Sequence, residues 1–77
     1  MRQHLLALDS LCNSKMGILS QITIDLVENT LCDFEDENFN IGAQIYKIQN
    51  ILEVIKPGLI LDIAILYQLK DILSNNK

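Results

Sequence analysis

The sequence has little of what most catalytic sites need. It contains no tryptophan, one proline, three glycines and one histidine. The glycines are isolated from one another, so no glycine-rich run is present to cradle a phosphate group. A single histidine, His4, near the start of the chain, offers no serine or cysteine nucleophile a well-placed base, and most of the acids fall in one segment rather than in an opposed pair. We therefore expect a protein that is not an enzyme and that uses no cofactor.

Cysteine is also scarce, and long apolar runs are absent. Cys12 and Cys32 lie too far apart for a CxxC pair, and two thiols with one histidine give neither a disulfide framework nor a zinc site. We interpret both thiols as small, half-buried apolar residues. The first apolar patch is short and is interrupted by Asp9, which is unlike a signal peptide, and no apolar stretch has the length needed to span a bilayer. These features predict a cytoplasmic protein that makes no membrane contact.

Basic residues are few and scattered. The chain has six Lys and Arg against ten Asp and Glu, which gives a formal net charge of −4. A protein that follows a phosphate backbone needs a basic patch or stripe, and the sequence shows none. Nucleic acid is therefore not an expected partner.

Apolar side chains, in contrast, are abundant. Leu, Ile, Val and Phe together number 29, against 16 charged residues. A domain of this size buries only about 60% of the surface that its unfolded chain exposes, so one small core does not easily hide so much apolar surface. Small domains compensate with disulfides, metals or oligomerisation, and only oligomerisation is left here. The composition predicts a homodimer or a stable complex with a second protein.

Apolar spacing divides the chain into helices. Residues 1–13 predict a short helix or a frayed end. Residues 14–31 predict an amphipathic helix whose apolar side carries Ile18, Leu19, Ile22 and Leu26, with Thr30 as a further candidate. Asn40 can cap a helix over residues 41–55, whose apolar seam repeats with 4-3-4-3 spacing and is widened by two more side chains. The seam is formed by Ile41, Ile45, Ile48, Leu52 and Ile55, and Ile51 and Val54 widen it.

Residues 59–73 are apolar nearly all round the helical wheel, which is typical of a buried helix, with a β-strand as the alternative. A turn at Lys56-Pro57-Gly58 should lay this helix antiparallel to the preceding one. We expect an all-α single domain of three to four helices over residues 1–77, with a helical hairpin in its C-terminal half and an intertwined dimer built on that hairpin. One apolar stripe of the last helix (residues 59, 63, 66 and 73) or the other (residues 61, 65, 69 and 72) should face the partner. The expected interface comprises Ile48, Leu52, Ile55, Leu59, Ile63, Leu66, Leu69 and Leu73.

Residues 32–40 have no apolar period and a concentrated negative charge, so they predict a loop. Its acids are Asp33, Glu35, Asp36 and Glu37. We interpret them as a solvated connector, with a docking loop for a basic partner or a calcium loop as alternatives. Their spacing does not follow the alternating pattern of an EF-hand. Phe34 and Phe39 should fold back onto the helices.

The pattern of Ile45, Ile48, Leu52-Glu53, Asp62 and a final apolar stretch over residues 69–73 resembles the AriR/YmgB family of small regulators of biofilm formation and acid resistance. The Leu19-Ser20-Gln21 segment followed by Leu26 is similar to the preceding helix of that family, although the acidic loop is longer here. The resemblance implies a dimeric three-helix protein that connects to a signalling or regulatory partner. The family's link to DNA is not carried over, because the chain is acidic.

Two other functions remain open. The segment Asp62-Ile63-Ala64-Ile65 with Leu66-Tyr67 is similar to the needle chaperones of type III secretion, which implies an export chaperone that shields an amphipathic helix of a secretion-system subunit. A minor structural subunit of a larger complex is the third hypothesis.

Overall fold

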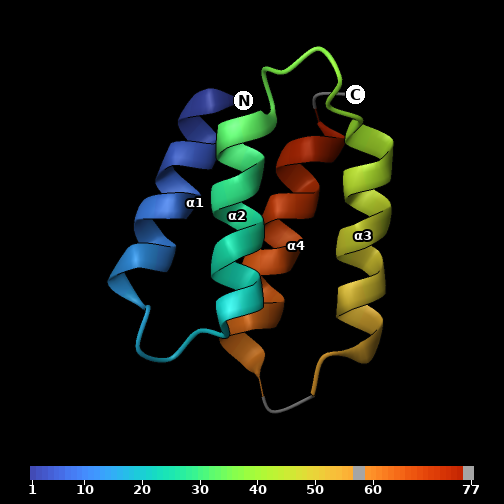
Figure 1. Cartoon of the computed structure of the whole chain (residues 1–77). Coiled ribbons are helices and arrows are strands. Elements are labelled where there is room, and N and C mark those ends of the chain that lie inside the picture. The colour runs from blue at the N-terminus through green and yellow to red at the C-terminus, as the bar shows by residue number, and fades with distance from the viewer. Residues whose placement is uncertain (57–58, 76–77) are drawn as a thin grey trace.

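The computed structural model describes residues 1–56 and 59–75, and within them it contains four helices and no strand. The helices are α1 (Arg2–Ser14), α2 (Gln21–Asp33), α3 (Ile41–Val54) and α4 (Ile60–Ser74) (Figure 1). The all-α prediction is confirmed, and the strand alternative for residues 59–73 is wrong. No helix in these two described stretches is long and apolar enough to cross a membrane.

The four helices alternate in direction, and α4 is the one that holds them together. It packs against α1, α2 and α3, while α1 and α2 also pack against each other. In contrast, α2 and α3 make no close backbone contact anywhere in the described residues. The arrangement is therefore a three-helix core of α1, α2 and α4, with α3 attached to it through α4 (Figure 1).

Both apolar stripes of α4 contribute to the chain's own core. Leu66 and Leu73 from one stripe and Ile65 and Leu69 from the other are all fully buried. The prediction that a single stripe faces the chain's own domain is wrong, because three helices rather than one surround α4. The full set of buried apolar residues is Leu5, Leu8, Cys12, Leu19, Ile24, Leu26, Val27, Ile45, Ile48, Ile65, Leu66, Leu69 and Leu73.

Helix α1 supplies the cover for α4 that the sequence did not reveal. It is a helix over Arg2–Ser14, so the short-helix alternative for residues 1–13 is confirmed and the frayed end is wrong, and it buries Leu5, Leu8 and Cys12. These residues are spaced three and four apart, so they form one stripe on the helix. An isolated helix of this length is marginal in water, and its burial against α2 and α4 is what stabilises it.

Helix α2 begins later than expected. The prediction of a helix over residues 14–31 is wrong at its start, since the helix begins at Gln21 and ends at Asp33. The preceding residues form a turn in which the backbone N–H of Ile18 donates to the Lys15 carbonyl at 3.0 Å. Ser20 takes the N-cap position in extended geometry, and its own side chain makes no capping hydrogen bond.

The predicted apolar side of residues 14–31 is correct in part, because Leu19, Leu26 and Thr30 are buried as expected. Thr23, Ile24 and Val27 are buried, whereas Ile18 is 66% exposed and Ile22 is 56% exposed. The expected stripe was drawn through Ile18 and Ile22, but α1 and α4 both pack on the side that carries Thr23 and Val27. Two large apolar side chains are thereby left in solvent.

Helix α3 matches its prediction closely. The Asn40 side chain accepts a hydrogen bond from the backbone N–H of Ala43 at 2.9 Å, which is the expected N-cap. Ile45 and Ile48 are buried, and the rest of the predicted seam is partly buried against the core, but Val54 is 81% exposed and does not widen the stripe. The helix ends at Val54, and the predicted turn at Lys56-Pro57-Gly58 lies largely outside the described residues.

The acidic connector between α2 and α3 is anchored by its aromatic residues. Phe34 and Phe39 are partly buried and pack against the core, as expected. The chain as a whole has a radius of gyration of 11.7 Å, close to the roughly 11.5 Å of a compact domain of this length. A single copy thus closes on itself, and the homodimer stays a prediction.

Candidate functional site

One carboxylate is enclosed in the core. Asp62 on α4 is 1% exposed, and its Oδ2 accepts hydrogen bonds from the backbone N–H of Ser20 at 3.0 Å and from the Thr23 hydroxyl at 2.7 Å. The first N–H groups of a helix have no partner within the helix, and they favour a negative charge nearby. Asp62 therefore caps α2 from a neighbouring helix and fixes where α2 begins. This contact is structural, because substrate cannot reach the carboxylate.

The buried thiol beside this carboxylate is unreactive. Burial first, and then the negative charges of Asp9, Asp62 and Glu28, together raise the pKa of Cys12 from its usual 9.0 to about 11. A thiol is nucleophilic only as the thiolate, so a raised pKa removes that reactivity at neutral pH. Asp9 Oδ1 is buried without a hydrogen-bond partner in the described structure, and the nearby acids make no metal cluster among the residues described.

The acidic loop divides into two parts. Asp33, Glu35, Asp36 and Glu37 are all exposed. Glu35 forms an ion pair with Arg2 on α1. Asp33 and Asp36 instead line an open hollow of about 340 Å³ between the loop and α3.

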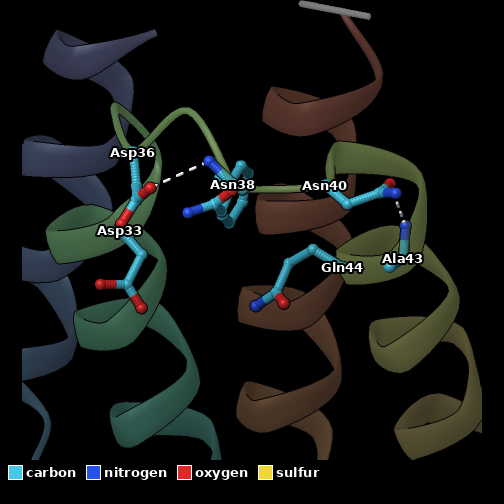
Figure 2. Close-up of a pocket in the computed structure, with 7 residues that line it drawn as sticks. Asp33, Asp36, Asn38, Asn40, Ala43 and Gln44 are labelled. Atoms are coloured by element: carbon cyan, nitrogen blue, oxygen red, sulfur yellow. Dashed lines mark hydrogen bonds between the residues drawn. The ribbon is translucent and has the colours of Figure 1, made fainter.

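This hollow at the acidic end is shaped by short local hydrogen bonds. Asp36 Oδ1 accepts from the Asn38 backbone N–H at 2.9 Å, and Asn40 caps α3 on the opposite wall (Figure 2). Gln44 completes the wall on α3, and Phe39 lines the hollow from the loop. The structure thus brings two of the four predicted acids to one cavity and leaves Glu35 and Glu37 outside it.

Two further hollows continue along the seam between α2 and α3. The middle one has a volume of about 320 Å³ and the last about 390 Å³, and Ile22 and Ile51 belong to the walls of both. The middle hollow carries Gln21, Asp25, Leu26, Asn29 and Lys47, and the last carries Ser20, Val54, Ile55, Lys56 and Leu59. We call this row of three hollows the α2–α3 groove.

A hydrogen bond between side chains of α2 and α3 crosses the groove. Gln44 Nε2 on α3 donates to the hydroxyl of Thr30 on α2 at 3.0 Å, and that hydroxyl donates to the Leu26 carbonyl at 2.8 Å. Thr30 is 1% exposed, so this bridge forms the floor of the groove rather than its rim. The groove is acidic at one end, where Asp33 and Asp36 lie, and apolar at the other, where Val54 and Ile55 lie.

The eight predicted interface residues fall into two groups. Ile48, Leu66, Leu69 and Leu73 are 0% exposed in the single chain, so a partner could meet them only if the bundle opened. The other four are half-buried and accessible, namely Leu52, Ile55, Leu59 and Ile63. Their role as a partner interface stays a prediction.

A second surface lies on the outer side of the α3–α4 hairpin. On α4, Ile60 is 75% exposed, Ile63 is half-buried and Tyr67 is 52% exposed, and their spacing of three and four residues places them in one row. On α3, Tyr46 is 66% exposed, and its spacing from Gln49 and Glu53 places these three residues on one side of the helix. We call the surface formed by these residues and by Gln49, Leu52, Glu53 and Lys70 the hairpin face.

The hairpin face is hollowed and carries balanced charge. Its hollow of about 400 Å³ is lined by Gln49, Leu52, Glu53, Tyr67 and Lys70. The Lys70 ammonium lies 6.0 Å from the centre of the Tyr67 ring, within range of a cation–π interaction. Sequence reasoning missed Ile60 and Tyr67, although their spacing with Ile63 was available as a third stripe of the last helix.

Searches with family models, curated proteins and solved structures found no match to this chain.

Proposed function

We propose that the chain is a non-enzymatic regulatory or connector protein of the cytoplasm, which acts by binding other proteins and pairs with a second copy of itself through the hairpin face. The observation that carries this proposal is the exposed row of Ile60, Ile63 and Tyr67 on the most apolar helix of the chain. Large apolar side chains gathered on one surface mark interaction sites more often than scattered ones do. The resemblance to the AriR/YmgB family suggests biofilm and acid-stress control as the regulated process.

The charge of the hairpin face favours a second copy as its occupant. The whole chain has a formal net charge of −4, so two random faces would bring like charges together. The hairpin face carries one acid, Glu53, and one base, Lys70, and is therefore neutral as a unit. A two-fold dimer buries the same patch on both subunits, and a neutral apolar patch meets its own copy without charge repulsion.

The two free thiols support a location in a reducing compartment. Cys12 is buried and unpaired, and Cys32 is exposed and unpaired. Proteins of oxidising compartments seldom keep a free thiol on their surface. A cytoplasmic location is therefore part of the proposal.

Sedimentation velocity at several concentrations tests the dimer. The unmodified chain should sediment at twice the monomer mass, and Ile60→Asp should sediment as a folded monomer. An Asp at the first position of α4 favours the positive end of the helix, so this change leaves folding intact. Val54→Asp, an equally exposed change on the other side of α3, is the matched control and should stay dimeric.

The dimer is refuted if the unmodified chain is monomeric at all concentrations or if both variants keep the dimer mass. A chain that is insoluble alone and becomes soluble only when co-expressed with a partner would favour the export chaperone instead.

A further inference from the structure

We infer that the α2–α3 groove binds an amphipathic helix of a partner protein, with the basic residues of that helix at the Asp33 and Asp36 end and its apolar residues at the Ile22 and Val54 end. This inference rests on the proposed function as a binding protein, but it concerns a different surface from the hairpin face. Its first support is the architecture: α2 and α3 are neighbours of α4 that make no close backbone contact with each other in the described residues. The seam between them is therefore open, apart from the Gln44–Thr30 hydrogen bond that crosses its floor.

The length and depth of the seam fit a helix. The α2 segment has 13 residues, which corresponds to about 20 Å of helix, and hollows of about 340, 320 and 390 Å³ follow one another along it. Peptide helices bind such grooves by inserting apolar side chains at i, i+3 or i+4, and i+7. A partner helix of about four turns would match the three hollows.

The apolar end is prepared for such side chains. Val54 is 81% exposed and Ile22 is 56% exposed, and both border the hollow whose remaining walls include Ile51, Ile55 and Leu59. Most of the surface of Ile22 and Val54 faces solvent, so burial of these two side chains contributes little to the stability of the free chain. Covering them with the apolar side of a helix removes their surface from water.

Charge complementarity sets the chemistry of the other end. Asp33 and Asp36 share the hollow there with no basic residue in its walls. Asp33 ends α2, where the helix dipole already adds negative potential. An arginine or lysine of the partner would neutralise this end. The polarity from acidic to apolar therefore specifies the composition of the bound helix and requires its basic and apolar residues to lie at opposite ends.

The test uses synthetic helical peptides and two-dimensional ¹⁵N–¹H NMR of the labelled full chain. The probe is a peptide of about 14 residues with two lysines in its first turns and three leucines in its last turns. The control has the same composition with its lysines and leucines interspersed along the whole peptide, and a second control replaces lysine with glutamate. The probe should shift the signals of Ile22, Gln44 and Val54, bind about tenfold more tightly than either control, and weaken as salt is added.

Three variants make the result specific. Val54→Lys and Asp33→Asn should each weaken binding of the probe about tenfold, and Asp33→Asn should also reduce the dependence on salt. Ile60→Lys on the hairpin face should leave probe binding unchanged, whatever it does to the dimer. All three positions are exposed, so circular dichroism should report a native fold in each.

Equal binding of the probe and the interspersed control peptide, or shifts confined to the hairpin face, would overturn the inference. So would groove signals that move on dilution without peptide, because a second copy would then occupy the groove. Loss of the dimer with intact probe binding would refute only the proposed self-association, and loss of probe binding with an intact dimer would refute only the groove.

Discussion

Replacing Asp62 with alanine should destabilise the fold far more than replacing any exposed acid. The carboxylate is 1% exposed and holds the start of α2 through Ser20 and Thr23. Hydrogen bonds to a charged group contribute about 1.5–3 kcal/mol each, and a buried partner left unsatisfied costs about 1–3 kcal/mol. Without the carboxylate, the Thr23 hydroxyl cannot donate to water instead, because Thr23 is 0% exposed. The backbone N–H of the half-buried Ser20 can do so in part.

We expect Asp62→Ala to lower the free energy of unfolding by about 3 kcal/mol, after allowing for the desolvation cost that the charge no longer imposes. For a domain of this size, that change lowers the melting temperature by roughly 12–24 °C. Urea unfolding followed by circular dichroism measures the free energy, and a thermal scan measures the temperature. Asp71→Ala on the same helix is the matched control, since Asp71 is exposed, and it should change stability by less than about 0.5 kcal/mol.

A double-mutant cycle with Thr23→Val assigns the loss to the contact. Thr23→Val alone removes one donor and should cost about 1–2 kcal/mol. The double variant should lose less than the two single losses together, because the second change removes a bond that the first has already broken. Equal losses for Asp62→Ala and Asp71→Ala, or strictly additive losses in the cycle, would refute the tertiary cap.

Three further predictions concern single side chains. With Ellman's reagent in native buffer, the exposed Cys32 should react at once, and the buried Cys12 should react only on unfolding. Reaction of both thiols in the folded protein would contradict the burial of Cys12. Folding raises the pKa of Cys12 from 9.0 to about 11, so the folded state holds the thiol proton more tightly than the unfolded state does. This contribution to stability is complete below pH 9 and is lost as the pH rises to 11. Urea titrations over that range should show a decline in the free energy of unfolding that Cys12→Ala lacks. Asn40→Ala should cost about 1 kcal/mol through the lost cap of α3, and Asn50→Ala, exposed on the same helix, should cost less than half of that.

The C-terminal half of the fold could be read from the sequence, and the N-terminal half only in part. Asn40 capped its helix and the seam through Ile45 and Ile48 was buried as expected, because both signals are local. The start of α2 could not be read this way. It depends on Asp62, which lies 42 residues further along the chain than Ser20, and residue spacing within one helix carries no sign of such a contact.

The surfaces were harder to predict than the core. Composition correctly indicated that some apolar side chains would remain exposed, but it could not say which. Ile22 and Leu26 look equivalent on a helical wheel, yet Ile22 is exposed and Leu26 is buried, because the direction from which α1 and α4 approach decides the outcome. The groove likewise arises because α2 and α3 make no close backbone contact in the described residues, and the sequence does not record which pairs of helices pack closely.

The position of α4 has a consequence for biosynthesis. Three helices depend on it, and it is the last of the four to leave the ribosome. Until its residues emerge, α3 has no surface to pack on, and α1 and α2 can form only a hairpin that leaves Leu8 and Val27 without their full cover. The nascent chain should therefore stay protease-sensitive until α4 has left the ribosome and then become resistant in a single step.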